Sequence, residues 1–269
     1  MSERAADILD QIVTRTRLKV AERQMRLPLE KILAQSQTRR PRRPFGAALA
    51  AEGGPQVIAE FKRRSPSRGL IREDLQVVHV AHAYQQGGAA ALSVLTEPEW
   101  FGGSIEDLRQ ARAATRVPVL RKDFIVDAYQ IWESWQAEAD AILLIVAALS
   151  DNQLARLMQT AAQANLEVLV EVHDEDELTR ALAVGASIVG VNNRDLRTLH
   201  VDLATSLKLA PRIPDGVVSV AESGIRSAED VRRLSDAGFD AFLIGEQLMS
   251  APNPGQALSE LIGAARGGH

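Results

Sequence analysis

The amino-acid sequence predicts one (β/α)8 barrel, a TIM barrel, with an N-terminal helical extension. The chain has 269 residues and 46% hydrophobic content, which suits a single barrel of ordinary size. Eight short apolar segments alternate with segments of helical pattern, at the spacing of roughly 20 to 35 residues that one βα unit needs. Eight such units favour a closed barrel over an open sheet, because a closed barrel has no edge strand to protect. We expect one domain over residues 1–269, with residues 1–47 as the extension.

The extension begins with an amphipathic segment over residues 8–33, where apolar side chains recur at helical spacing and charges occupy the other face. This pattern predicts a helix. The basic run RRPRRP at residues 39–44 follows, and its prolines cannot continue a helix. The run fits either a solvated connector or a dedicated binding patch, and we favour the connector.

Eight apolar segments, many rich in β-branched residues, predict the strands of the barrel. In chain order they cover residues 56–61, 90–95, 117–122, 141–146, 167–172, 187–192, 217–222 and 241–246. Helical segments lie between them, and several open with Asp or Ser, which can cap a helix. The segment SAED from Ser227 resembles a capping box with Asp230 in place of the usual Glu.

Composition and charge exclude several classes of protein. The formal net charge of -4 and the pI near 5.8 argue against nucleic acid or anionic lipid as the main partner. There is no cysteine, so neither a disulfide framework nor a thiolate metal site exists. The five histidines show no ligand motif, and we expect no metal site. No apolar stretch has the length of a signal peptide or membrane span, so we expect a cytoplasmic protein.

Polar residues at the carboxyl ends of parallel strands should converge on one mouth of the barrel. Five predicted strands end in, or lead directly into, such residues: Glu60, Lys62, Lys122, Glu171, Asn192, Arg194 and Glu222. One glutamate at a strand end is most often solvated or a cap. The whole set predicts a catalytic mouth, because clustered charges in a concave site shift one another's pKa. His173 follows Glu171 closely, and we expect it at the rim or behind Glu171 rather than as a base.

The loops after the last two strands predict a phosphate site. They read ESGIRS (222–227) and IGEQLM (244–249), and Gly224 and Gly245 would let backbone N–H groups approach an anion. Each glycine could also serve only to let the chain turn tightly between a strand and a helix. A carboxylate repels phosphate, so we expect the Glu246 side chain to point away while its N–H donates. The basic loop KRRSPSRG (62–69), which contains Ser65, is either a lid over an anionic substrate, which we favour, or a solvated turn.

The motifs together resemble the indole-3-glycerol phosphate synthase family of tryptophan biosynthesis. The blocks IAEFKRRSPSRG, LSVLTEPEWFGGS, LRKDFIVDAYQI, LVEVHDEDEL, GVNNRDLRTL, VAESGI and FLIGEQLM occur in the family's order. A phosphate-binding barrel alone is common, whereas the Glu-Phe-Lys, Arg-Lys-Asp-Phe and Val-Glu-Val-His set is specific. The resemblance runs from the extension through the eighth strand.

The resemblance implies a reaction, namely conversion of 1-(2-carboxyphenylamino)-1-deoxyribulose 5-phosphate to indole-3-glycerol phosphate with loss of carbon dioxide and water. It implies that Lys122 is the general acid for ring closure and that Glu171 acts in the later dehydration. Glu60, Lys62 and Asn192 complete the catalytic set, and which of the four charged residues handles each proton stays open. Substrate contacts are implied for Ser65, Phe101, Phe124, Leu143, Arg194, Glu222 and Ser223, and phosphate contacts for Gly224, Gly245 and Glu246.

The same resemblance implies no cofactor, because the substrate's own carbonyl serves as the electron sink. The expected partner is a phosphorylated small molecule, with neither nucleic acid nor membrane. We expect a monomer and leave association with other tryptophan-pathway enzymes open. Two rivals remain. A phosphoribosylanthranilate isomerase should lack the extension and the joint presence of Lys122 and Glu171. A barrel that binds a ligand without catalysis should lack some of the charged residues at the strand ends, and all of them are present.

Overall fold

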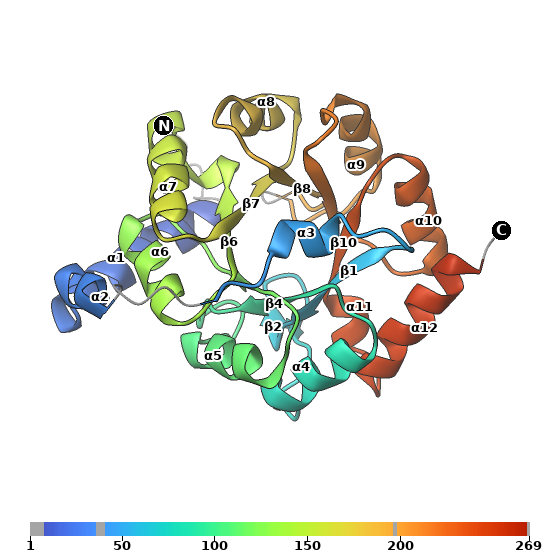
Figure 1. Cartoon of the computed structure of the whole chain (residues 1–269), viewed down its shortest axis with the longest axis horizontal. Helices are drawn as coiled ribbons and strands as arrows, with labels where there is room; N and C mark the ends of the chain where they lie inside the picture. The colour runs from blue at the N-terminus through green and yellow to red at the C-terminus, as the bar shows by residue number, and fades with distance from the viewer. Residues whose placement is uncertain (1–7, 36–40, 196–197, 268–269) are drawn as a thin grey trace, which may run out of the picture.

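The computed structural model describes residues 8–35, 41–195 and 198–267, and its centre is a closed barrel of parallel strands (Figure 1). The strands neighbour one another in the order β1, β10, β9, β8, β7, β6, β5, β4, and β4 closes on β1. This confirms the predicted (β/α)8 barrel. The strands are β1 (Gln56–Phe61), β4 (Ala91–Leu95), β5 (Val119–Lys122), β6 (Ala141–Ile145), β7 (Glu167–Val172), β8 (Ile188–Asn192), β9 (Val218–Glu222) and β10 (Ala241–Ile244).

Several strands are shorter than the apolar segments that predict them. The segment 241–246 ends as a strand at Ile244, because Gly245 is already the N-cap of the short helix α11 (Glu246–Met249). The segment 141–146 ends at Ile145, and a 3-10 turn, η1 (Val146–Ala148), follows. In β5 the strand starts after Pro118, which has no N–H to give to a ladder.

The strands are buried on both faces, as expected for a parallel sheet covered by helices. The surrounding helices are α4 (Val77–Gln86), α5 (Ile105–Ala114), α6 (Ala128–Gln136), α7 (Asp151–Gln163), α8 (Glu175–Ala183), α9 (Ala204–Leu209), α10 (Ala228–Asp236) and α12 (Pro254–Arg266). The capping box of α10 is confirmed: Asp230 N donates to Ser227 Oγ over 3.2 Å. In the described ranges no helix combines the length and apolar character needed to cross a bilayer.

The extension folds as separate helices rather than one over residues 8–33. Helix α1 (Ile8–Arg26) ends before Pro28, and α2 (Leu29–Gln35) begins after it. Proline removes a backbone donor and disfavours helical backbone in the residue before it, which explains the break. The first turns of α1 reach the mouth of the barrel, where Ile8, Leu9 and Ile12 line a cavity.

A third helix, α3 (Phe45–Leu49), lies at the opposite end of the barrel, near its centre in Figure 1. The N–H groups of Phe45 and Gly46 donate to the Glu167 carboxylate at the start of β7. Within the basic run, Arg39 and Arg40 lie outside the described residues. Arg43 is not a solvated connector residue, because its guanidinium donates to Val117 O over 2.8 Å. The solvated interpretation is therefore wrong for Arg43, which ties the extension to the barrel.

Candidate active site

A cavity of about 320 Å³ opens at the carboxyl ends of the strands. Every site residue predicted from the sequence lines it: Glu60, Lys62, Ser65, Phe101, Lys122, Phe124, Leu143, Glu171, Asn192, Arg194, Glu222, Ser223, Gly224, Gly245 and Glu246. They come together because all eight strands run in the same direction.

Lys122 lies at the end of β5 between two carboxylates. Its Nζ is 3.1 Å from Glu171 Oε2 and 3.3 Å from Glu222 Oε2, and its side chain is 14% exposed. Burial alone would lower the pKa of this amine, but Glu171, Glu222 and Glu60 outweigh burial and hold the pKa above its usual range. The cavity therefore contains a fixed ammonium at neutral pH.

Glu171, at the end of β7, is the best-paired carboxylate of the mouth. Besides Lys122, it accepts a hydrogen bond from Asn192 Nδ2 over 3.0 Å and lies 3.4 Å from His173 Nε2. Burial would raise the pKa of Glu171, but Lys122 and His173 outweigh it and the pKa is lowered. Glu171 is therefore ionised in the neutral range.

His173 lies behind Glu171 and does not line the cavity. Its ring lies between two carboxylates. Nδ1 is 3.0 Å from Glu177 Oε2 on α8, and Nε2 is 3.4 Å from Glu171 Oε1. Burial disfavours the charged ring, but the contacts with Glu171 and Glu177 raise the pKa of His173 to about 10. A charged imidazole stabilises the Glu171 carboxylate from outside the cavity.

Glu222, at the end of β9, has the opposite environment. Only one of its carboxylate oxygens meets Lys122, and Oε1 is buried with no hydrogen-bond partner among the described residues. A Cβ on Gly190 would overlap Oε1, so the glycine provides the space that this oxygen occupies. Burial, together with Glu171 and Glu60, raises the pKa of Glu222 to about 7 although Lys122 opposes the change. Glu222 can therefore carry a proton near neutral pH.

Glu60 and Lys62 form a second pair at the end of β1, with Lys62 Nζ 2.8 Å from Glu60 Oε1. The other oxygen of Glu60 accepts from Ser93 Oγ over 3.4 Å. A Cβ on Gly245 would overlap the Glu60 carboxylate. Gly245 therefore has a steric role that the sequence alone does not reveal, besides its place in the predicted phosphate loop.

The loops after β9 and β10 meet a cluster of arginines. Ser223 and Gly224 both have positive φ, 65° and 81°, a conformation that turns the chain sharply at this point. Arg68 and Arg226 line the cavity beside these loops. Neither is among the site residues predicted from the sequence, although both stand in the segments KRRSPSRG and ESGIRS.

The Glu246 carboxylate does not point away from this region, so that expectation is wrong. Its Oε1 is 2.6 Å from Arg68 Nε, and its Oε2 is 3.9 Å from Arg194 NH2. Both arginines line the cavity. Pairing with guanidinium groups offsets the repulsion that we expected, because the carboxylate and an anion can share the same cations.

The apolar wall of the cavity includes Phe101, Phe124 and Leu143. The two phenylalanine rings have centroids 6.0 Å apart and planes tilted by 37°, a separation at which aromatic rings attract. The first turns of α1 add apolar side chains to the cavity lining. Helical periodicity predicts an apolar face on α1 but not the surface it packs against.

The loop after β1 folds into a two-stranded hairpin, β2 (Arg64–Ser65) with β3 (Gly69–Leu70). Its turn, residues 65–68, lines the cavity. Arg63 anchors the base of the hairpin through two bonds to Asp107, of 2.7 and 2.8 Å. Movement of this loop as a lid stays a prediction. Among the residues that the structure describes, no group of three or more His, Asp or Glu has the arrangement of a metal site.

Comparisons with known proteins match nearly the whole chain. A family model described as indole-3-glycerol phosphate synthase matches residues 9–261. An indole-3-glycerol phosphate synthase of Acidithiobacillus ferrooxidans is 50% identical, covering 95% of this chain and 98% of the relative. One of Albidiferax ferrireducens is 48% identical over 96% and 99%. A solved 3-hexulose-6-phosphate synthase from Salmonella typhimurium has a TM-score of 0.63 at 12% identity, covering 80% of this chain and all of that one; that likeness concerns the fold alone.

Proposed function

The chain belongs to the indole-3-glycerol phosphate synthase family, and from this premise we propose which residues carry out its reaction. The chain is a carboxy-lyase of tryptophan biosynthesis that converts 1-(2-carboxyphenylamino)-1-deoxyribulose 5-phosphate to indole-3-glycerol phosphate. Three events must occur in one cavity: ring closure, loss of carbon dioxide and loss of water.

In ring closure, the aromatic carbon that bears the carboxylate attacks the C2 carbonyl carbon of the sugar. Negative charge develops on the carbonyl oxygen, and a proton must reach it. We propose Lys122 as the donor. Its ammonium is held between Glu171 and Glu222 inside the cavity, so it is charged and positioned before substrate arrives.

After closure, the C–C bond to the carboxylate breaks, carbon dioxide leaves, and its electron pair restores the aromatic ring. Dehydration then removes the C2 hydroxyl and a proton from C1, which creates the pyrrole double bond. We propose that Glu171 takes the C1 proton, because the lowered pKa of Glu171 makes it a carboxylate at neutral pH. From the opposite side of the mouth, Lys62, paired with Glu60, gives the departing hydroxyl the proton with which it leaves as water.

The remaining residues bind the two ends of the substrate. The backbone of residues 223–224 and 245–246, with Arg68, Arg194 and Arg226 nearby, would hold the phosphate. Phe101, Phe124 and Leu143 would contact the benzene ring. Asn192 orients Glu171 through its 3.0 Å hydrogen bond, and Glu222 and Ser223 would contact the sugar.

The observation that carries these assignments is the placement of Lys122 between two glutamates, in the same cavity as the arginine-lined loops. The test is incubation of the purified protein with 1-(2-carboxyphenylamino)-1-deoxyribulose 5-phosphate while indole absorbance and fluorescence are followed. We expect the indole signal to rise with enzyme concentration. Folded wild-type protein that produces no indole signal would contradict the activity.

A further inference from the structure

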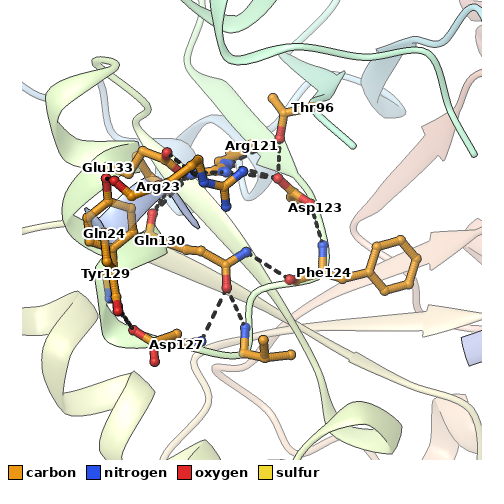
Figure 2. Close-up of polar contacts among 12 residues, drawn as sticks. Arg23, Gln24, Thr96, Arg121, Asp123, Phe124, Asp127, Tyr129, Gln130 and Glu133 are labelled. Atoms are coloured by element: carbon orange, nitrogen blue, oxygen red, sulfur yellow. Dashed lines mark hydrogen bonds and ion pairs between the residues drawn. The ribbon is translucent and has the colours of Figure 1, made fainter. Parts of the chain in front are cut away.

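Arg121 precedes Lys122 on β5, but its side chain points the other way, toward α6 (Figure 2). It is fully buried, with 0% of its surface exposed. A buried guanidinium is costly unless its donors are matched. Here they are: the N–H groups are directed to Thr96 Oγ1 (3.1 Å), Asp123 Oδ2 (2.8 Å), Gln130 O (3.0 Å), Glu133 Oε2 (3.0 Å) and Ser134 Oγ (2.9 Å).

Asp123 connects this guanidinium to the cavity wall. One carboxylate oxygen accepts from Arg121 and from Thr96 Oγ1, the latter over 2.5 Å. The other oxygen accepts from the backbone N–H of Phe124 over 2.8 Å. Burial would raise the pKa of Asp123, but Arg121 outweighs it and the pKa is lowered. Asp123 is therefore a fixed acceptor for the Phe124 N–H.

The backbone carbonyl of Phe124 is held as well. Gln130 Nε2 donates to Phe124 O over 2.9 Å, while Gln130 Oε1 accepts from Val126 N over 2.9 Å. Figure 2 shows the Gln130 side chain extending to the Phe124 backbone from the same side as Arg121. With its N–H and C=O both bound to buried side chains, Phe124 has little freedom to shift, and its ring stays in the cavity wall beside Phe101.

The network ends on the N-terminal extension. Glu133, the second carboxylate at Arg121, also forms an ion pair with Arg23 on α1, with Nε and Oε1 3.1 Å apart. Two arginines and two carboxylates thus balance in charge, which is the condition under which a buried ionic network persists. A cluster with balanced charge and satisfied hydrogen bonds is rigid, so it holds the loop that bears Phe124 in one position.

We propose that Arg121 is a positioning residue for the reaction: by holding Asp123, it fixes the backbone of Phe124 and so places that ring against the benzene ring of the substrate. The role rests on the proposed function, because it takes Phe124 as a wall of the aromatic subsite. Lysine cannot replace arginine here, since an ammonium has three donors and no planar fork to serve partners on three sides.

The test is Arg121→Lys, with Asp123→Asn as a second variant that keeps side-chain shape. We expect kcat/KM to fall about tenfold or more in both, because a small misplacement of a bound ring is costly in rate. Affinity for the product indole-3-glycerol phosphate, measured by fluorescence titration, should fall about tenfold, while inhibition by inorganic phosphate should change less than about twofold. If Arg121→Lys fails to fold, Asp123→Asn decides by the same measurements.

A matched control lies at the other end of the same strand. Arg112 Nε is 3.0 Å from Asp140 Oδ2, and that carboxylate oxygen accepts from the N–H of Val119, the first residue of β5. Arg112→Lys should lower thermal stability to a similar degree yet leave kcat/KM within about twofold, because this pair is remote from the mouth.

A double-mutant cycle separates positioning from general destabilisation. In a Phe124→Ala background, Arg121→Lys should change kcat/KM by less than about threefold, because the group through which it acts is gone. An equal effect in both backgrounds, or a parallel loss of phosphate affinity, overturns the positioning role. Wild-type protein without turnover contradicts the proposed function instead, whereas wild-type turnover with unchanged Arg121→Lys kinetics contradicts this inference alone.

Discussion

Glu222 Oε2 lies 3.3 Å from Lys122 Nζ, at nearly the distance that separates Lys122 from Glu171, yet the pKa values of the two carboxylates are shifted in opposite directions. Glu171 has Asn192 and His173 as further partners, whereas Glu222 has a buried oxygen without any among the described residues. The pKa of Glu171 is lowered and that of Glu222 is raised to about 7. Carboxyl groups whose pKa values are pushed apart can act as base and acid in one site.

Glu222 should lower the stability of the protein at alkaline pH. Its folded pKa of about 7 exceeds the ordinary value of 4.5, so folding is penalised increasingly as pH rises from about 4.5 to 7. We expect Glu222→Gln to raise the free energy of unfolding by on the order of 1–3 kcal/mol at about pH 8.5, and by little near pH 4.5. Denaturant unfolding at both pH values measures this. A gain of the same size at both would contradict the assignment.

His173 should stabilise the protein in its charged form. The pKa of His173 is raised to about 10 from 6.5, so its contribution is complete below about pH 6.5 and is lost as pH rises through 10. We expect His173→Gln to lower the free energy of unfolding by on the order of 1–3 kcal/mol at about pH 6, and by much less above pH 10. Exposed His79 on α4 supplies the control, His79→Gln, which should change the free energy of unfolding by less than about 0.5 kcal/mol because the side chain is on the surface.

Lys122→Ala should abolish turnover while the barrel still folds. The ammonium is the proposed proton donor to the carbonyl, and loss of a general acid lowers kcat by about 10²- to 10⁴-fold. Lys122→Met, which keeps the side-chain volume, should behave alike and so excludes a packing effect. Steady-state kinetics and circular dichroism measure the two outcomes. Wild-type rates in either variant would show that the acid is misassigned.

Arg68→Ala should weaken substrate binding more than it slows chemistry. Arg68 Nε lies 2.6 Å from Glu246 Oε1 at the proposed phosphate loops. We expect KM to rise about tenfold and kcat to change less than about threefold, because the guanidinium acts on a group that does not react. Arg64→Ala, on the same hairpin but exposed and outside the cavity lining, should leave both constants unchanged. A fall in kcat at constant KM would contradict the assignment.

The positions of the mouth residues could be predicted, whereas their pairing could not. Glu60, Lys122 and Glu171 follow recognisable apolar strands, and the common direction of the strands forces them together. The pairing of Arg68 with Glu246 joins residues 178 apart in the chain, and no local pattern encodes it. Proline chemistry could have predicted the break of the extension at Pro28. The helical periodicity continues on both sides of Pro28, however, and it led us to predict one uninterrupted helix.

The sequence by itself determined the eight-unit barrel and the end at which the polar residues gather, because the hydrophobic period of each segment and the order of the segments can be read along the chain. The resemblance to the family came from the motifs. Only the tertiary structure decided which carboxylate is ionised, where α1 packs, and how Arg121 supports Phe124. These depend on burial and on distances between atoms from different strands, such as Lys122 and Glu171, which are 49 residues apart. A pKa or a hydrogen-bond network belongs to that arrangement in space and to no single segment of the chain.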